Sequence, residues 1–341
     1  MGLFKYPARI PKGIGAVVGL GLILGGSIGT AANAALVAFQ SFNGKVALST
    51  DGWGGLDGSG VISASAPSGS TVIAAYLYTA TQNSSTVPTT VTLDGNSVTY
   101  TASFANATAC CNLRSNRVDV TSLVKPVIDG GGGGVYNFAI EEGGANGAID
   151  GHALVVVYSN AALPEASVGI LDGFASVTGD TTSINFANAL DPSDPGFFAE
   201  MILGINFSCC SQKSRVDVNG QLLTENAGNK DDGENGDANG NLITVGSFDD
   251  PFAPLNPTYA TDSERYNLAS FITAGDTSIK VDTFNASQDD NIFLAAFYVS
   301  GEAGFNQPPP STSTVPLPAA GWLLVGGLGG LAGLRRRRKA A

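Results

Sequence analysis

Positive charge is scarce in the central part of this 341-residue chain. Eight of the 17 Lys and Arg residues lie within the first 12 and the last seven positions, which leaves nine in the body against all 29 Asp and Glu residues. A body with this excess of carboxylates is repelled by phosphate backbones, so the composition argues against nucleic acid as a partner. Divalent cations and basic partners suit it better.

The motifs of common catalytic sites are also missing. The chain has one histidine, His152, and its body, residues 35–304, has no G-x-S-x-G nucleophile motif. The run "DGGGGG" at 129–134 has no lysine of a phosphate loop, and no C-x-x-C motif is present. His152 stands at the start of an apolar run, where we interpret it as a structural residue at a strand end. We therefore predict a protein that is not an enzyme.

Long segments with helical periodicity are absent from the body, whereas short apolar or alternating runs recur through residues 35–302. The chain has 45 glycines and many β-branched residues, a mixture that favours twisted strands and tight turns. Asp94-Gly95 and Asn219-Gly220 are dipeptides typical of two-residue hairpin turns. The sequence therefore predicts an all-β fold. The expected strands are 71–78, 91–100, 135–140, 153–158, 200–207, 241–245, 278–284 and 292–299.

The body also contains an internal repeat. Three pairs of segments match: "VTLDGNSV" (91–98) with "VDVNGQLL" (216–223), "RVDVTSLV" (117–124) with "RYNLASFI" (265–272), and "DGHALVVVY" (150–158) with "DNIFLAAFY" (290–298). Elements that recur in the same order indicate a duplicated unit. We predict two related antiparallel β-sandwich modules of jelly-roll or immunoglobulin-like type, at residues 35–164 and 165–304. One larger sandwich is the alternative.

Residues 1–34 have the order of parts of a secretory signal peptide. Three basic residues precede an apolar run from Ile14 to Ile28, and Ala32-Asn33-Ala34 follows it. We expect signal peptidase to cleave after Ala34. A retained membrane helix is the alternative, although the run is short and rich in glycine.

The C-terminal segment, residues 315–341, follows a Pro/Ser/Thr linker at 305–314. Its parts are Val315-Pro316-Leu317-Pro318, the apolar stretch Ala319–Leu334 with Trp322, and the cluster Arg335, Arg336, Arg337 and Arg338. As a helix the stretch spans about 24 Å, less than the ~30 Å hydrocarbon core of a bilayer. We therefore expect a hydrophobic helix that anchors the chain in the membrane transiently, with the arginines on the cytoplasmic side.

This order of parts resembles the PEP-CTERM sorting signal, which exosortases process in Gram-negative bacteria that make extracellular polysaccharide. Leu317 stands where that family usually has Glu. The resemblance implies export across the inner membrane, processing by an exosortase, and delivery to the cell surface or the medium. A plain tail anchor is the alternative. The body, in segments such as "AAYLY" (74–78) and "LITVGSFDDPF" (242–252), resembles exported bacterial β-sandwich modules of unassigned activity.

The four cysteines occur as two vicinal pairs, Cys110-Cys111 and Cys209-Cys210. Because export leads to an oxidising compartment, we predict structural disulfides. Of the three connectivities, one closes two vicinal bridges and the other two link the halves of the body. A zinc site of four thiolates is disfavoured, because zinc sites use C-x₂₋₄-C spacing.

One segment has the composition of a cation site. In "NKDDGENGDANGN" (229–241), Asn235, Asp237 and Asn239 alternate as oxygen ligands ahead of a turn glycine, which predicts calcium binding. A solvated acidic loop is the alternative reading. The sequence as a whole predicts an exported, non-enzymatic surface or extracellular-matrix protein that associates with exopolysaccharide or with like chains. A polysaccharide-active enzyme of the cell surface is the second hypothesis.

Overall fold

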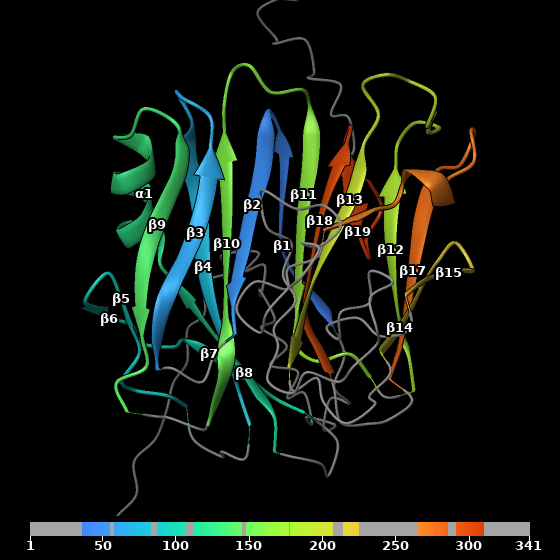
Figure 1. The fold of residues 1–341 in the computed structure, drawn as a ribbon. Helices are drawn as coiled ribbons and strands as arrows, with labels where there is room; N and C mark the ends of the chain where they lie inside the picture. The colour runs from blue at the N-terminus through green and yellow to red at the C-terminus, as the bar shows by residue number, and fades with distance from the viewer. Residues whose placement is uncertain are drawn as a thin grey trace, which may run out of the picture. The chain divides into compact units, whose positions relative to one another are not determined.

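The computed structural model describes residues 36–54, 58–82, 87–106, 112–144, 148–176, 178–206, 214–224, 265–285 and 291–309. All of them belong to one compact unit, residues 33–341. Within these ranges the chain forms 19 β-strands, one α-helix and one 3₁₀ helix (Figure 1). Every pair of neighbouring strands is antiparallel. The predicted all-β fold is confirmed.

The strands form four sheets, which we number I to IV. Sheet I has the order β3 (Ser59–Ala66), β9 (Gly134–Glu141), β5 (Thr92–Leu93), β6 (Asn96–Ser97). Sheet II has the order β2 (Val46–Trp53), β10 (Ile149–Ser159), β4 (Thr71–Thr81), β8 (Arg114–Asp119), β7 (Ala102–Ala105). Sheet III has the order β1 (Val37–Gly44), β11 (Ala166–Asp172), β18 (Asn291–Ser300), β13 (Ala199–Asn206), β16 (Arg265–Asn267). Sheet IV has the order β15 (Gln221–Thr224), β14 (Ser214–Val218), β17 (Ser278–Asn285), β12 (Asp180–Phe186), β19 (Ala303–Phe305).

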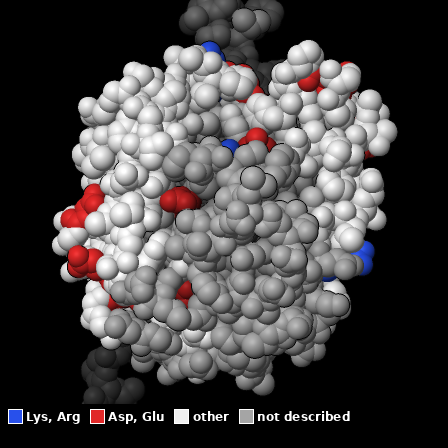
Figure 2. Space-filling view, viewed as in Figure 1, with Lys and Arg blue, Asp and Glu red and all other residues white. Residues whose placement is uncertain are grey.

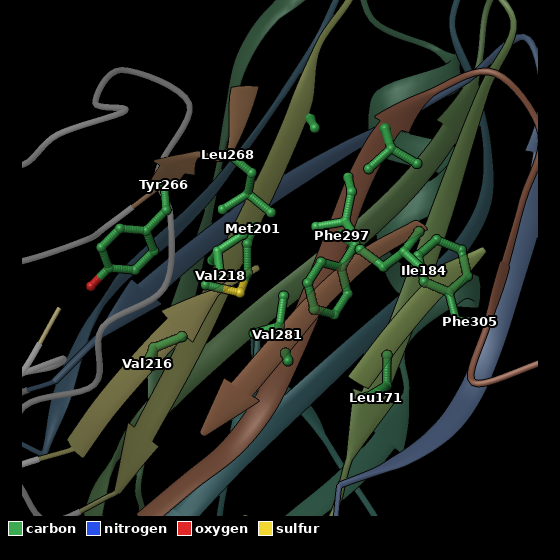
Figure 3. Close-up of a cluster of buried hydrophobic side chains, with 14 of the residues drawn as sticks. Leu171, Ile184, Met201, Val216, Val218, Tyr266, Leu268, Val281, Phe297 and Phe305 are labelled. Carbon is green, nitrogen blue, oxygen red and sulfur yellow. The ribbon is translucent and has the colours of Figure 1, made fainter. Parts of the chain in front are cut away.

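The four sheets stack face to face and enclose three apolar cores. One core lies between sheets I and II, with Ile62 and Phe138 facing Leu77 and Leu154. A second lies between sheets II and III. The third lies between sheets III and IV, and Figure 3 shows its side chains, among them Met201 and Phe297. Sheets II and III are therefore covered on both faces.

This layering explains the two kinds of strand sequence. Strands β10 and β11 of the inner sheets are buried along nearly their whole length, as continuous apolar runs require. Strands β3 and β12 of the outer sheets alternate between buried and more exposed residues, because one face of each sheet meets solvent.

The strand order of the first half recurs in the second. Without β7, sheet II runs β2-β10-β4-β8; without β1, sheet III runs β11-β18-β13-β16. Sheet I runs β3-β9-β5-β6; without β19, sheet IV runs β12-β17-β14-β15. When the strands of each half are numbered along the chain, the two orders are the same. The strands β1 and β19 pair with β11 and β12, respectively, and the described residues of the first half contain no counterpart of either.

The two predicted hairpin turns form, and they share a detail. Asp94 and Asn219 adopt φ values of 49° and 50°, and the glycine after each is also at positive φ. Oδ1 of Asp94 accepts a hydrogen bond of 2.7 Å from the backbone N–H of Ala139 on β9. Oδ1 of Asn219 accepts one of 2.9 Å from the N–H of Lys280 on β17. Each turn is thus fastened to the equivalent neighbouring strand.

Three features differ from the sequence-based expectation. The helix α1 (Thr121–Asp129) was not expected, because nine residues that bury only Val124 and Ile128 give a weak periodic signal; a 3₁₀ helix, η1 (Ala269–Phe271), occupies the matching place in the second half. Residues 91–100 form a hairpin rather than one strand. Strand β1 lies in the range expected for the first module but pairs with β11 of the second half. None of the helices in the described ranges has the length and apolar character needed to cross a membrane.

Candidate functional sites

Apart from His152, the candidate site residues singled out from the sequence lie outside the described ranges. They are the sorting-motif residues Val315, Pro316, Leu317, Pro318, Trp322, Arg335, Arg336, Arg337 and Arg338, the cleavage-site residues Ala32 and Ala34, the cysteines Cys110, Cys111, Cys209 and Cys210, and the calcium-site residues Asn235, Asp237 and Asn239. Their roles remain predictions. The described residues contain three other arrangements that bear on function.

The first arrangement is a buried chain of polar groups around His152, the fourth residue of β10. Nδ1 of His152 lies 2.8 Å from Oγ1 of Thr79 on β4, and its Nε2 lies 3.3 Å from Oε1 of Glu142. The Thr79 hydroxyl also meets the hydroxyl of Tyr100. Trp53 stacks on the imidazole with ring centroids 5.8 Å apart. A hydroxyl, an imidazole and a carboxylate thus lie in a row between sheets I and II.

The local sequence explains how this cluster packs. His152 and Thr79 lie opposite each other in strand register and face sheet I, and Trp53 is the register partner of His152 on the other side. Gly60 on β3 leaves room for the indole, because a Cβ there would lie 2.1 Å from the Trp53 ring. The position therefore requires glycine.

Burial shifts the pKa values of two members of the cluster, His152 and Tyr100. Desolvation lowers the pKa of His152 below its ordinary value, and this effect outweighs the neighbouring Glu142, which raises it. Burial likewise raises the pKa of the Tyr100 phenol. His152 and Thr79 are 0% exposed and Glu142 is 2% exposed. Thr79, His152 and Glu142 are residue types that serve as nucleophile, base and acid in catalysis. In this conformation they are buried, and their hydrogen bonds connect neighbouring parts of the fold.

The second arrangement joins the two halves of the body. Arg117 on β8 forms an ion pair with Asp172 on β11, and the Tyr78 hydroxyl on β4 donates a 3.0 Å hydrogen bond to the same carboxylate. The Arg117 guanidinium lies 3.3 Å from the ring centroid of Phe39 on β1. Nearby, Nδ2 of Asn206 on β13 donates to backbone carbonyls of sheet II. These polar contacts link sheets II and III across a core that is mostly apolar.

The third arrangement is a groove of about 280 Å³ between β1 and β19. Residues from the edge strand of sheet III line one side of it, and residues from the edge strand of sheet IV and the segment after it line the other. The lining side chains include Gln40, Ser41, Asn43, Phe305 and Gln307. None of the lining residues is charged.

A second hollow of similar size lies among the loops at 186–197 and 300–302, and it is acidic, with Asp191, Asp194 and Glu302. Asp191 and Asp194 cap local turns through Ser193 and Gly196, respectively. Within the described ranges, no three His, Cys, Asp or Glu side chains are arranged to hold one metal ion. On the face shown in Figure 2, Asp and Glu form several separate patches, while Lys and Arg appear at few points.

Comparisons with known proteins assign no family. No protein-family model matches the chain, and no curated protein matches it. Among solved structures, a beta-porphyranase of glycoside hydrolase family 86 from the human gut bacterium Bacteroides plebeius aligns over 81% of this chain and 38% of its own, with 10% identity and a TM-score of 0.21. The wild-type BuGH86 enzyme in complex with neoagarooctaose aligns over 81% and 35%, with 8% identity and a TM-score of 0.20. This chain therefore spans well under half of each, and TM-scores this low do not establish a common fold.

Proposed function

We propose that this protein is exported, sorted by an exosortase, and serves as a non-enzymatic surface or extracellular-matrix protein associated with exopolysaccharide. The observation that carries the proposal is the order of parts in residues 315–341: a Pro-containing tetrapeptide, a short apolar stretch with Trp322, and four consecutive arginines. The signal-peptide pattern ending at Ala34 is in accord with it. In this account the chain crosses the inner membrane of a Gram-negative bacterium, is anchored briefly, and is then released to the surface or the medium.

We also infer that the body consists of two related β-sandwich modules that arose by duplication. The shared strand order of sheets I and II with sheets IV and III supports this inference. So do the equivalent hydrogen bonds of Asp94 and Asn219. A third shared contact precedes the helical turns: Asp119 accepts a hydrogen bond from the N–H of Thr121, and Asn267 accepts one from the N–H of Ala269. Repeated β modules with acidic surfaces are well suited to a structural role outside the cell.

The cysteine pairs fit the same account if they link the halves. Asn206 donates a 3.1 Å hydrogen bond to the carbonyl of Arg114, so these two residues are adjacent. Cys110 precedes Arg114 by four positions, and Cys209 follows Asn206 by three. An extended chain covers about 3.3–3.6 Å per residue, so these spacings permit a disulfide between the two pairs. We therefore favour the two connectivities that cross between the halves, and peptide mapping under non-reducing conditions distinguishes them from two vicinal bridges.

The test of sorting uses the producing bacterium. Mass spectrometry of surface and secreted material should find peptides from the body and none from residues 319–341. Replacement of Arg335, Arg336, Arg337 and Arg338 by alanine should leave the protein unprocessed in the membrane fraction. Leu317→Glu, which restores the usual residue of the family, is the matched variant and should be processed at least as well as the parent. Mature material that keeps Ala341 would refute the proposal.

Two further measurements address the cofactor and the enzymatic alternative. If residues 229–241 bind calcium, EDTA should lower the melting temperature and added calcium should restore it, and an unchanged transition would count against the site. Incubation with the exopolysaccharide of the same bacterium should release no new reducing ends. Their appearance would favour a polysaccharide-active enzyme over the proposed structural role.

A further inference from the structure

The groove between β1 and β19 distinguishes the second half from the first. Strand β1 extends sheet III beside β11, and β19 extends sheet IV beside β12. The equivalents of β11 and β12 in the first half, β2 and β3, are the edge strands of sheets II and I and carry no such extension. The two added strands therefore build a recess at one edge of the second sandwich that the duplicated scaffold does not itself provide.

The groove offers hydrogen-bonding groups that solvent can reach. Gln40, Ser41, Asn43 and Gln307 line it and are exposed. The Asn43 carboxamide is held in place, because its Oδ1 accepts a hydrogen bond from Ser167. Among the described strands, β1 pairs with β11 alone and β19 with β12 alone, so each also has a main-chain edge that no described strand pairs.

The lining excludes several classes of ligand. It has no Lys or Arg to bind a phosphate or a uronic acid, and no carboxylate to bind a cation. Its exposed polar side chains are amides and a hydroxyl, and Ala38, Phe39 and Pro308 add apolar surface that is at least partly exposed. The other aromatic residue, Phe305, is 3% exposed and forms part of the buried core. Groups that both donate and accept hydrogen bonds match a ligand with many hydroxyls and no charge. The volume is near the lower end of roughly 300–1,000 Å³ for small-molecule sites, which suits a short segment of a longer chain.

We propose that the groove between β1 and β19 binds a short uncharged segment of a polysaccharide. This inference rests on the proposed function and names the part of the exopolysaccharide that the protein recognises and the place where it does so. The charge of the rest of the body supports it. The acidic surface of the body repels acidic polymers, whereas it does not repel a neutral glycan. In the uncharged groove such a glycan would meet hydrogen-bonding groups and no carboxylates.

A peptide strand is the competing occupant, and two observations disfavour it. The pairing of β1 with β11 is interrupted by a bulge between Ala38 and Gln40, a device that makes an edge strand a poor template for another strand. Pro308 lines the groove, and the sequence continues with Pro309 and Pro310; none of the three has a backbone N–H to donate to a ladder.

Binding is tested with the full chain, purified in a detergent without a sugar headgroup. The probes are maltohexaose, cellohexaose and laminarihexaose, together with neutral oligosaccharides prepared by partial hydrolysis of the bacterium's own exopolysaccharide; hexagalacturonic acid is the charged comparison. We expect at least one neutral probe to bind by titration calorimetry and the charged one not to bind.

The double variant Gln40→Ala/Gln307→Ala should raise the dissociation constant about tenfold, because two hydrogen bonds are lost. Gln221→Ala, an exposed glutamine on β15 at the opposite edge of sheet IV, should leave it unchanged.

Three results would overturn the inference: no neutral probe binds at millimolar concentration, the charged probe binds as well as the neutral ones, or the double variant and Gln221→Ala behave alike. Self-association that the double variant abolishes would also overturn it, in favour of a second copy of this chain. Failure here is separable from failure of the sorting proposal. A protein that loses residues 319–341 but binds no neutral glycan refutes the groove alone, and one that binds through Gln40 and Gln307 but keeps Ala341 refutes sorting alone.

Discussion

Equivalent positions in the two halves of the body hold a polar pair in one and an apolar pair in the other. His152 on β10 lies opposite Thr79 on β4, whereas Ile292 on β18 lies opposite Ile205 on β13. The match of residues 150–158 with 290–298 equates His152 with Ile292. Each pair faces the outer sheet of its own half, and all four residues are at most 2% exposed.

The difference shows that the arrangement of strands does not determine which side chains fill the space between two sheets. Both pairs lie between antiparallel strands, although the ladder of β18 with β13 has a register shift next to Ile205, and in neither case does the ladder determine which side chains fill the space between the sheets. In the second half, isoleucines fill it as part of the core between sheets III and IV. In the first half, the polar pair is retained in a dry site because Tyr100 and Glu142 complete its hydrogen bonds. The halves thus differ in the side chains at this position and share their strand order.

The largest effect is expected where the halves meet. Asp172→Ala removes the carboxylate that Arg117 and Tyr78 share between sheets II and III. Because Asp172 is 4% exposed and its partners remain without it, we expect the free energy of unfolding to fall by about 3 kcal/mol. Urea denaturation monitored by tryptophan fluorescence and by circular dichroism measures this loss.

The control is Glu302→Ala, which removes an exposed carboxylate from a loop of the second half and should leave stability unchanged. If the two halves are joined tightly by this contact, the two probes should also separate in Asp172→Ala, since Trp53 reports on the first half. A loss as small as that of Glu302→Ala would mean that the apolar core between sheets II and III alone holds the halves together.

The polar pair predicts a pH dependence that the second half cannot produce. The folded protein keeps His152 neutral because burial lowers its pKa, whereas the unfolded chain takes up a proton below about pH 6.5. The unfolded state then binds more protons than the folded state. The free energy of unfolding therefore has its highest value above that pH and decreases as the pH falls below it. The slope attributable to His152 is at most about 1.4 kcal/mol per pH unit.

His152 is the one histidine of the chain, but burial also raises the pKa of Glu200, so the share of His152 between pH 5 and 6.5 is obtained by comparison with a variant that lacks it. His152→Gln, which does not titrate, should flatten the stability profile in this interval. Should that variant fail to fold, nuclear magnetic resonance of the imidazole in the parent protein gives the same information, because its signals should remain those of a neutral ring at pH 5.5. A ring that titrates near 6.5 in the folded state would contradict the prediction.

The sequence predicted those parts of the fold that depend on neighbouring residues. The hairpin turns at Asp94-Gly95 and Asn219-Gly220 form as expected, because a two-residue turn is determined by its own backbone preferences. The segments that match in the sequence repeat also occupy equivalent strands in the two halves. By contrast, nothing in Val37–Gly44 indicates that it pairs with β11 across more than 120 residues rather than with its neighbour β2. The continuous apolar runs of β10 and β18 predicted buried strands, but not that a second sheet covers their other face.

The sites were less predictable than the fold, and for a physical reason. Thr79 and Glu142 lie 73 and 10 positions from His152, and their hydrogen bonds arise only when sheets I and II pack. Arg117 and Asp172 are 55 positions apart and belong to different halves. Such pairs have no characteristic spacing in sequence. The one available signal was the lone histidine at the start of an apolar run, which we interpreted as a structural residue at a strand end. In the structure it is the fourth residue of β10 and is fully buried, and the sequence did not indicate its partners.

The smallest effect tests what the two halves share. Gly95 and Gly220 have φ values of 70° and 76°, and a Cβ on either would have no atom within 4 Å. Substitution by alanine therefore adds no steric clash and penalises only the positive φ, which we expect to cost about 1 kcal/mol in each case. Thermal denaturation of Gly95→Ala, Gly220→Ala and the double variant measures the two costs and their additivity. Equal and additive losses would mean that both turns keep the conformation of one ancestral hairpin, since distant sites that share no contacts contribute independently. If Gly220→Ala lowered the stability much more than Gly95→Ala, the second hairpin would depend on contacts that the first does not have. The hairpins β5-β6 and β14-β15 would then share their topology but not their contribution to stability.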